Sequence, residues 1–542
     1  MLGLMQQQPL LISSLITHAQ RHHGRTEIVS RRVEGDVHRC TWGEVGVRAA
    51  RVAHALDAWE VAQGARVATL AWNGYRHLEM YFGVSGSGRV LHTLNPRLHP
   101  DQLAWIVNHA QDTVLAFDMT FLPLVQKVHA QCPSVQHWVA LCDADALPAD
   151  TGIANLSSYE AWIDGHPSAY DWPMLDERSA SSMCYTSGTT GDPKGAVYSH
   201  RSTILHAYGG ALPDTLGLSA RDSVLPVVPM FHVNAWGIPY SAAAVGCKLV
   251  FPGGALDGAS VYELIESEGV TMAAGVPTVW QMLLAHLSQT QQRFSSLQRT
   301  VIGGSACPPA MIDTFVQTYG VDVLHAWGMT EMSPLGTVST LKYSQQQDSA
   351  AAQRQVRLKQ GRAVFGVDMK IVDDDGQEVP WDGQRFGNLM VKGPWVIDNY
   401  YRADTPLLKD GWFHTGDVGT IDPEGFLQIT DRSKDVVKSG GEWISSIDIE
   451  NIAMAHPGVA MAACVGVPHP KWDERPVLFV VKKDAADIDR QTLLDFYQGK
   501  IAKWQVPDDV IFVDAIPLGA TGKIQKMALR EQLSDYVHPE LR

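Results

Sequence analysis

A loop with the sequence YTSGTTGDPKG, residues 185–195, has residue types that suit phosphate binding. Its glycines leave backbone N–H groups approachable, its hydroxyls can donate to phosphate oxygens, and Lys194 adds a positive charge. A Walker A loop has Gly directly before its lysine and a hydroxyl residue directly after it, whereas here Pro193 precedes Lys194 and Gly195 follows it. We therefore predict a phosphate loop of another lineage; the alternative is a surface loop rich in Gly, Ser and Thr.

Six further stretches carry candidate chemistry along most of the chain. In order they are PMFHVNAW (229–236), IGGSACP (302–308), HAWGMTE (325–331), GWFHTGD (411–417), DRSKDVVKSGGEWIS (431–445) and TGKIQK (521–526). Together with the loop at 185–195, they resemble the motifs of the adenylate-forming superfamily, which includes acyl-CoA synthetases, luciferases and peptide-synthetase adenylation domains. The resemblance implies that a carboxylate attacks the α-phosphate of ATP and expels pyrophosphate. Because this reaction brings anions together, the protein must supply positioning and positive charge.

The resemblance assigns most of these motifs to ATP and magnesium. Thr186 and Glu331 are its metal positions, and a hydroxyl with a carboxylate suits Mg²⁺; in isolation Glu331 would be a solvated surface acid. Asp417 would accept hydrogen bonds from both ribose hydroxyls, with Arg432 as its basic partner, although singly they would be a turn residue and a surface ion pair. The other nucleotide-binding positions are Ser187, Gly188, Thr189, Thr190, Gly191 and Lys194 at the phosphates, Gly304, His325, Ala326 and Trp327 (more often Tyr in the family) around the adenine, and Thr330 beside the metal position.

Three lysines are assigned to the two half-reactions that the resemblance implies. Lys523 resembles the lysine that contacts the α-phosphate and the substrate carboxylate during adenylation; otherwise a lysine near a C-terminus is simply solvated. Lys434 corresponds to the hinge, and Lys438 is the candidate for the second half-reaction. The coenzyme A side also includes Gly440 and Gly441, which would let a pantetheine arm pass close to the backbone, and Trp443.

His232 and Trp236 are the candidates for the pocket of the acid substrate. His232 resembles the family's aromatic-pocket residue near the acyl carboxylate, and its role is either positional or acid–base. Trp236 has two interpretations, a plug of the acyl tunnel until ATP binds, as in long-chain relatives, or a core tryptophan. Relatives that activate amino acids have an acidic residue at this motif, and its absence from FHVNAW disfavours amino acids.

The sequence most resembles bacterial medium- and long-chain fatty acid–CoA ligases, above all the medium-chain ligase of alkane degradation. The stretches that carry this likeness are KSGGEWIS, PMFHVNAWGIPYSAAAVG and HAWGMTE. The resemblance implies a two-step fatty acid–CoA ligase that uses ATP, Mg²⁺ and coenzyme A. One alternative is a CoA ligase for a non-fatty acid, such as an aryl, cinnamic or methylthio-alkanoic acid, and another is a non-catalytic homologue that senses acyl-AMP.

The elements that must position these motifs indicate an α/β protein. Short apolar strands alternate with helical stretches from about residue 40 to 430, which predicts largely parallel sheets, and a compact α+β pattern follows. We predict an N-terminal AMP-binding domain of layered α/β subdomains at 1–430 and a small mobile C-terminal domain at 431–542. The biased stretch at 343–355, YSQQQDSAAAQRQ, is interpreted as an exposed connection.

Composition narrows the class of protein further. The 43 Lys and Arg against 58 Asp and Glu give a net charge of −15, which argues against nucleic acid as a partner. Seven scattered cysteines without a C-x-x-C pair favour a reducing cytosol. The first residues lack the basic region of a signal peptide, and no apolar run approaches the roughly 18 residues of a membrane helix. A soluble cytoplasmic enzyme without a stable membrane anchor is expected, and some relatives form homodimers.

Overall fold

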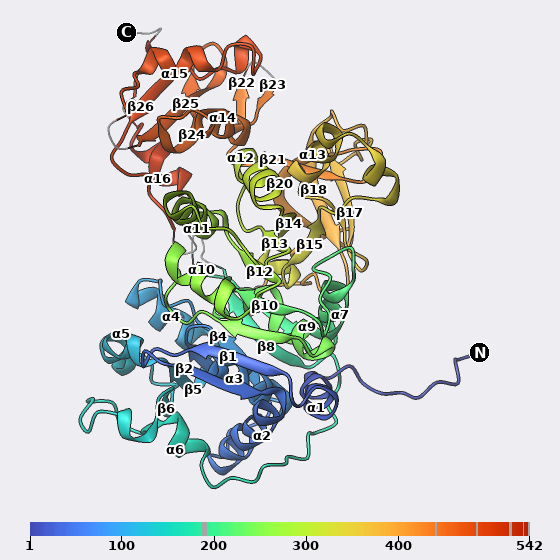
Figure 1. The fold of residues 1–542 in the computed structure, drawn as a ribbon, viewed down its shortest axis with the longest axis vertical. Coiled ribbons are helices and arrows are strands. Elements are labelled where there is room, and N and C mark those ends of the chain that lie inside the picture. Colours follow the sequence, from blue (N-terminus) through green and yellow to red (C-terminus); the bar gives the residue numbers. More distant parts are fainter. Residues whose placement is uncertain (187–191, 440–441, 484–485, 520–522, 535, 540–542) are drawn as a thin grey trace.

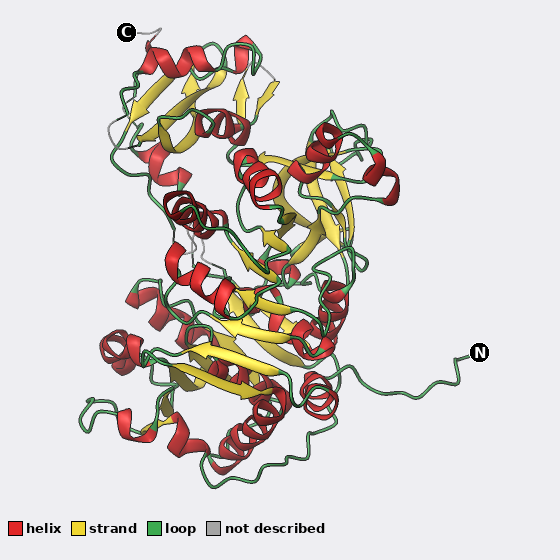
Figure 2. Ribbon diagram, in the orientation of Figure 1, coloured by secondary structure: helices red, strands yellow, loops and turns green. Residues whose placement is uncertain are grey.

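The computed structural model describes residues 1–186, 192–439, 442–483, 486–519, 523–534 and 536–539, with only the backbone at 442 and 443. Within these residues the strands form four sheets. Figure 1 shows three of them in a large part and the fourth in a small C-terminal domain at one end of the molecule. Figure 2 shows helices lying beside the sheets throughout.

The first sheet positions the predicted adenine and metal motifs. Its central strands pair in parallel, and antiparallel pairing is confined to its two edges. Strand β14 ends directly before Met329, so Thr330 and Glu331 follow it in a short 3-10 turn. Across the sheet the described strands are β16 (Arg362–Ala363), β15 (Leu335–Val338), β14 (Asp322–Gly328), β13 (Arg299–Ile302), β12 (Met272–Gly275), β10 (Ser223–Pro226), β11 (Lys248–Phe251), β1 (Glu27–Arg31) and β2 (Val37–Thr41).

The second sheet carries the strands on either side of the predicted phosphate loop. These two strands pair antiparallel, and the remaining described pairs are parallel. Across the sheet the strands are β7 (Leu156–Ser158), β6 (His137–Ala140), β5 (Asp112–Phe117), β3 (Arg66–Leu70), β4 (Val90–Thr93), β8 (Ala180–Tyr185) and β9 (Gly195–Ser199). Helix α3 (Tyr75–Gly86) is buried along its whole length, because it packs between strands of both sheets.

The third sheet is antiparallel and brings Asp417 opposite Arg432. Its strands are β17 (Asp368–Val372), β18 (Gly387–Lys392), β20 (Trp412–Ile421), β19 (Leu408–Lys409) and β21 (Leu427–Arg432). The fourth sheet forms the small domain, with β23 (Glu442–Ile444), β22 (Val437–Ser439), β25 (Asp473–Lys482), β24 (Val459–His469) and β26 (Asp509–Phe512). The chain therefore passes from one domain to the other between residues 432 and 437.

The described α-helices mostly connect or cover these strands. Helix α1 (Ile12–His22) buries one apolar face, which includes Leu15, Ile16 and Ala19. The other helices are α2 (Trp42–Ala58), α4 (Pro100–Ala110), α5 (Leu122–Val128), α6 (Tyr159–Ile163), α7 (His200–Ala211), α8 (Val233–Trp236), α9 (Ile238–Val245), α10 (Gly258–Ser267), α11 (Pro277–Thr290), α12 (Pro309–Asp313), α13 (Ala350–Leu358), α14 (Ser446–Met454), α15 (Arg490–Phe496) and α16 (Lys526–Glu531), after α1 (Ile12–His22). None of the described helices has both the length and the hydropathy of a membrane span.

The predicted fold class, a large α/β part with a small α+β domain, is confirmed, with three differences in detail. The sheet at 368–432 is antiparallel, although the pattern predicted largely parallel sheets up to about 430. The stretch at 343–355, predicted to be an exposed connection, is mostly exposed, but it includes most of α13. Ser349 caps that helix, and ion pairs of Arg354 with Asp313 and of Arg357 with Asp322 hold it. The boundary predicted at 430 falls inside β21.

Candidate active site

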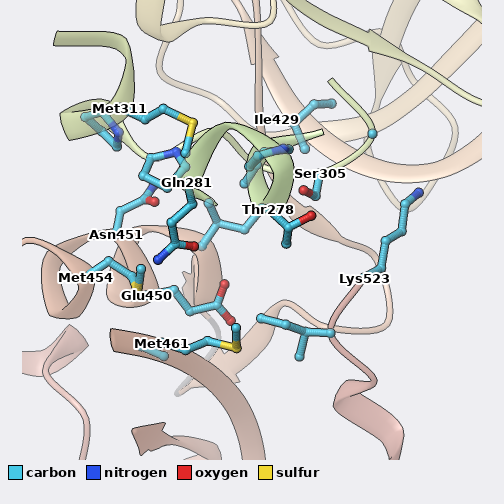
Figure 3. Close-up of a pocket in the computed structure, with 18 of the residues that line it drawn as sticks. Thr278, Gln281, Ser305, Met311, Ile429, Glu450, Asn451, Met454, Met461 and Lys523 are labelled. Carbon is cyan, nitrogen blue, oxygen red and sulfur yellow. The ribbon is translucent and has the colours of Figure 1, made fainter. Parts of the chain in front are cut away.

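A cavity of about 670 Å³ lies where the large part and the small domain meet. Its walls come from both domains, and side chains of each face the same space (Figure 3). Those labelled in the figure include Thr278, Gln281, Ser305 and Ile429 from the large part and Glu450, Asn451 and Lys523 from the small domain. The cavity therefore depends on how the two domains sit together.

Asp417 is a buried carboxylate held on both of its oxygens. Arg432, opposite it in the sheet, brings Nε to 2.8 Å from Oδ1. The indole Nε1–H of Trp327 donates to Oδ2 over 2.8 Å. Because each carboxylate oxygen has a second lone pair, Asp417 can still accept two hydrogen bonds from a ligand in the cavity. Two adjacent hydroxyls, such as those of a ribose, match this arrangement.

Gly304, Ala326 and Trp327 line the same end of the cavity. Gly304 has φ +83°, and a methyl group there would approach Val276 to 3.2 Å, so glycine suits this position. His325 lies behind the wall, because its Nδ1 is 3.1 Å from the carbonyl oxygen of Leu358. Burial lowers the pKa of His325 to about 4, so the ring is neutral at physiological pH. Of the residues predicted around the adenine, His325 is thus the one that the described cavity lining does not include.

Lys523 brings a charge of the small domain to this end of the cavity. The surrounding protein and the positive charge of Arg432 lower the pKa of Lys523 from the ordinary lysine value, while Asp417 and Glu331 oppose the shift. Lys523 therefore lies within electrostatic reach of the Asp417 and Glu331 carboxylates. Motifs that are far apart in the sequence therefore converge here.

Two hydrogen bonds between Thr186 and Lys194 join the two ends of the predicted phosphate loop. The N–H of Thr186 donates to the carbonyl oxygen of Lys194 over 2.9 Å, and the N–H of Lys194 donates to Thr186 Oγ1 over 3.3 Å. Ser187, Gly188, Thr189, Thr190 and Gly191 lie outside the described residues, so their contacts with phosphate stay predictions. The Lys194 ammonium group lies over the ring of Tyr400, with Nζ 5.1 Å from the ring centroid.

Glu331 is a buried carboxylate anchored from two directions. Its Oε1 accepts from the hydroxyl of Tyr400 over 2.5 Å, and its carbonyl oxygen accepts from the N–H of Ile397 over 2.9 Å. The hydroxyl of Tyr198 donates to the carbonyl oxygen of the preceding Thr330 over 2.6 Å. The carboxylate is therefore held in one orientation, with Oε2 as its second oxygen.

The donor set fits a magnesium ion that arrives with phosphates. Glu331 offers a carboxylate oxygen and Thr186 a hydroxyl, both hard ligands of the kind that Mg²⁺ prefers. No group of three or more His, Cys, Asp or Glu that could hold a metal ion occurs in the described part of the chain. A site with one or two protein ligands is typical of Mg²⁺, which takes its other ligands from water and from substrate phosphates.

His232 is the residue predicted to lie near the acyl carboxylate. Burial lowers the pKa of His232 to about 4, and the charges of Lys523 and Arg97 lower it further in the same direction. The ring is therefore neutral at physiological pH, so it carries no charge that would pair with a carboxylate substrate. This electrostatic setting favours the positional role of His232 over an acid–base role.

The four residues after His232 form a left-handed turn. Val233, Asn234, Ala235 and Trp236 have φ between +45° and +58°. Non-glycine residues in this region cost of order 1–3 kcal/mol each, so surrounding contacts must hold the turn. Asn234 supplies one of them, because its Nδ2 donates to Ser182 Oγ over 3.0 Å. Strained turns of this kind gather at functional sites.

Trp236 lies at the end of this turn, half-buried against the glycine pair of IGGSACP. A methyl group on Gly303 would lie 3.4 Å from Trp236 Cη2, and one on Gly304 3.8 Å from Cζ2. The indole ring of Trp236 therefore packs against the loop with Gly303 and Gly304, which lines the cavity through Gly304. Both interpretations of Trp236, tunnel plug and core residue, stay open on this geometry.

Lys434 and Lys438 are not among the described residues that line the cavity. The carbonyl oxygen of Lys434 accepts from Arg530 Nη2 over 3.1 Å, and the N–H of Lys438 donates to Glu474 Oε2 over 3.0 Å. The backbone of Trp443 pairs with that of Lys438 in the hairpin β22–β23. Gly440 and Gly441 lie outside the described residues, and the predicted coenzyme A side stays a prediction.

Several site residues were missed by sequence reasoning. Lys526, the last residue of TGKIQK, lines the cavity and forms a 2.7 Å ion pair with Glu450. Its place in a motif already singled out was a signal that could have been used. Thr278 and Gln281 on α11 and Tyr400 had no such signal, because they lie in stretches of ordinary composition.

Comparisons with known proteins agree with this geometry. The model of the AMP-binding enzyme family matches residues 15–401, and that of the AMP-binding enzyme C-terminal domain matches residues 448–523. The chain is 55% identical to the 3-methylmercaptopropionyl-CoA ligase of Ruegeria lacuscaerulensis, with 99% of each chain covered. It is 51% identical to the medium-chain-fatty-acid–CoA ligase of Ectopseudomonas oleovorans, over 99% of this chain and 98% of the relative.

A solved structure has the same fold over nearly the whole length. The anthranilate CoA ligase AuaEII in complex with anthranoyl-AMP aligns with a TM-score of 0.87 at 24% identity, over 98% of this chain and 99% of that one. At this level of identity the likeness concerns the fold alone. With both family models matched in order, the chain belongs to the AMP-binding enzyme family, as an AMP-forming acid–thiol ligase.

Proposed function

We propose that this ligase activates linear aliphatic carboxylic acids, with medium-chain fatty acids as its substrate class. The observation behind the adenylation chemistry is that Lys523 of the small domain lines the same cavity as Trp327, Asp417 and Arg432. That arrangement suits a reaction in which a carboxylate meets a nucleotide phosphate. The proposed substrate class follows the relative that is 51% identical and is named for medium-chain fatty acids. ATP, Mg²⁺ and coenzyme A are the other reactants that the reaction of this enzyme class requires.

In the first half-reaction a carboxylate oxygen attacks the α-phosphorus of ATP, and the bond to the β-phosphate oxygen breaks. Asp417 holds the ribose, and Lys523 donates to the α-phosphate and the incoming carboxylate. The positive charge thus lies where two anions must approach, which lowers the barrier by positioning and electrostatics. Bound between Glu331, Thr186 and the phosphates, Mg²⁺ would neutralise charge on the leaving pyrophosphate.

In the second half-reaction the sulfur of coenzyme A attacks the acyl carbonyl carbon, the bond to AMP breaks, and the thiol proton leaves to solvent. We propose that the small domain first rotates about Lys434. Lys523 then leaves the cavity, and the hairpin with Lys438 takes its place. The support is the position of Lys434 between β21 of one domain and β22 of the other. Rotation about a few linker residues is a common form of domain motion.

The acyl side favours an alkyl chain. Helix α9 after Trp236 carries no charged residue, and Ile238, Tyr240, Ala242 and Ala243 on it are buried. An apolar wall stabilises a linear chain by about 0.8 kcal/mol for each buried CH₂, which is roughly fourfold in kcat/KM. We expect kcat/KM to rise with chain length from butanoate upwards and to level off at the length that fills the pocket.

A second candidate substrate is 3-(methylthio)propanoate. The specific observation in its favour is the 55% identity with a relative named for that acid. This acid has the chain shape of pentanoate with sulfur in place of one methylene. Because sulfur–aromatic contacts contribute about 0.3–1.5 kcal/mol, a pocket that prefers the thioether should do so by roughly 2- to 10-fold over pentanoate.

The experiment is pyrophosphate release from a panel of acids, with coenzyme A present and absent. The panel holds linear acids of increasing length, 3-(methylthio)propanoate, benzoate and cinnamate. A maximum at a linear acid of medium length, above butanoate and pentanoate, supports the first proposal. A maximum at the thioether, above both pentanoate and hexanoate, supports the second. A preference for benzoate or cinnamate would exclude both.

We also propose a cytoplasmic location and a homodimer. All seven cysteines are buried and unpaired, which is the usual state in a reducing compartment. Light scattering on the purified protein tests the dimer, and a monomeric mass over the working concentration range would exclude it.

A further inference from the structure

Tyr400 lies on the connection between β18 and β19 and contacts two predicted phosphate-side motifs. Its hydroxyl donates to Glu331 Oε1 over 2.5 Å. Its ring packs in a small apolar cluster with Cys184, Ala196 and Ile397. A tyrosine hydroxyl has an ordinary pKa near 10, so at neutral pH it is a donor and Glu331 the acceptor.

The same ring lies beneath Lys194. The ammonium Nζ is 5.1 Å from the ring centroid, within the range of a cation–π contact. The lysine side chain is exposed, so this contact restricts a long and otherwise flexible group. One aromatic residue thus holds the cation of the phosphate loop with its face and the carboxylate of the metal motif with its hydroxyl.

The backbone supports the same contact. The N–H of Ile397 donates to the carbonyl oxygen of Glu331 over 2.9 Å, so the segment that carries Tyr400 is fixed to the residue whose side chain it orients. With Oε1 accepting from Tyr400, Oε2 is the oxygen left for a metal ion. A carboxylate held this way would offer a metal ion its second oxygen in a fixed direction.

We infer that Tyr400 is a positioning residue of the adenylation step, which orients Glu331 for magnesium and holds Lys194 over the pyrophosphate side of ATP. This inference rests on the proposed function. Outer partners of metal ligands typically affect metal affinity 10- to 100-fold. The hydroxyl and the ring face have separate tasks, so they can be removed separately.

The test measures metal affinity directly. Binding of Mn²⁺ to the whole protein with α,β-methylene-ATP is followed by EPR of free Mn²⁺, for Tyr400→Phe, Tyr400→Leu and the control Tyr401→Phe. We expect about 10- to 100-fold weaker Mn²⁺ binding in Tyr400→Phe, with Tyr401→Phe like the wild type. Tyr400→Leu should also weaken the nucleotide itself, because it removes the ring face beneath Lys194.

A second control separates orientation from loss of packing. Tyr198→Phe removes a neighbouring hydroxyl that bonds the backbone of Thr330 and leaves the Glu331 side chain untouched. The inference would be overturned if Tyr400→Phe and Tyr198→Phe weakened Mn²⁺ binding equally. It would also be overturned if Tyr400→Phe left the Mn²⁺ affinity unchanged. Thioester formation from supplied acyl-AMP should stay within about twofold in Tyr400→Phe, since outer-partner effects act through the metal. If no acid in the panel releases pyrophosphate, the proposed function fails, while the Mn²⁺ measurement still decides the role of Tyr400.

Discussion

Trp327 donates its indole N–H to Asp417 over 2.8 Å, across 90 positions of the sequence. Arg432 holds the other oxygen of the same carboxylate. The tryptophan is thus a hydrogen-bond donor as well as a wall of the cavity. Its indole connects β14 of the first sheet to β20 of the third sheet, which carries Asp417.

Trp327→Phe keeps an aromatic wall and removes this donor. The bond has a charged acceptor and contributes about 1.5 kcal/mol, so we expect roughly tenfold weaker ATP binding by isothermal titration calorimetry. Trp381→Phe is the control, because Trp381 is 40% exposed and lies outside the cavity lining. Equal affinities in the two variants would mean that Arg432 alone orients Asp417.

Lys523→Ala should separate the half-reactions. Loss of a cation aimed at the reacting phosphate costs about 10²- to 10³-fold in adenylation. Thioester formation from supplied acyl-AMP should change little, since the lysine leaves the cavity in that step. Rapid-quench measurement of each half-reaction decides this, and an equal loss in both would contradict the proposed domain rotation.

The alkaline limb of the pH profile should report Lys523. Desolvation and Arg432 lower the pKa of this ammonium group, so it loses its proton at a lower pH than an ordinary lysine. Because adenylation needs the charged form, its kcat/KM should fall as pH rises through this lowered pKa, at a lower pH than for an ordinary lysine. Lys523→Arg stays charged and should move the limb upward. If the alkaline limb of the pH profile stays at the same pH in Lys523→Arg, it reports the titration of another group.

Local motifs made much of the site predictable. The resemblance to the adenylate-forming superfamily assigned Asp417, Arg432, Gly304 and Lys523 to one site, and the structure brings all four to one cavity. Such prediction works because the backbone near each motif sets the side chain's neighbours. The α/β class followed in the same way from strands and helices with clear apolar patterns.

The remaining features depend on contacts between distant segments. Tyr400 meets Glu331 across 69 positions, and nothing near it in the sequence marks the pair. His325 and Trp327 are two residues apart on one strand, so alternation predicts the same side for both, yet only Trp327 is in the described cavity lining. The left-handed turn from Val233 to Trp236 uses residues that rarely adopt this conformation, so only its tertiary contacts explain it.

Asp431 makes contacts across the linker that should favour the domain orientation seen here. Its Oδ2 accepts from the N–H of Ser446 over 2.7 Å, and it attracts the buried ammonium group of Lys526. Rotation about Lys434 would separate these groups. Asp431→Asn should therefore slow adenylation by about 5- to 30-fold, a coupling of 1–2 kcal/mol, and spare thioester formation. Asp508→Asn is the control, since its ion pair with Arg475 lies within the small domain and outside the described cavity lining, and its loss should affect both steps alike.

Trp236→Ala distinguishes a tunnel plug from a core residue. If Trp236 were packed in a core, its truncation to alanine would lower the free energy of unfolding of the protein by about 3–5 kcal/mol. Trp236 is only half-buried, ends a strained turn and faces two glycines, so we expect a loss below about 2 kcal/mol. We also expect the preferred acid to become longer by one or more carbons, because the ring no longer limits the pocket. Chemical unfolding and the acid panel measure the two quantities on one sample. A large loss of stability with an unchanged chain-length profile would make Trp236 a core residue.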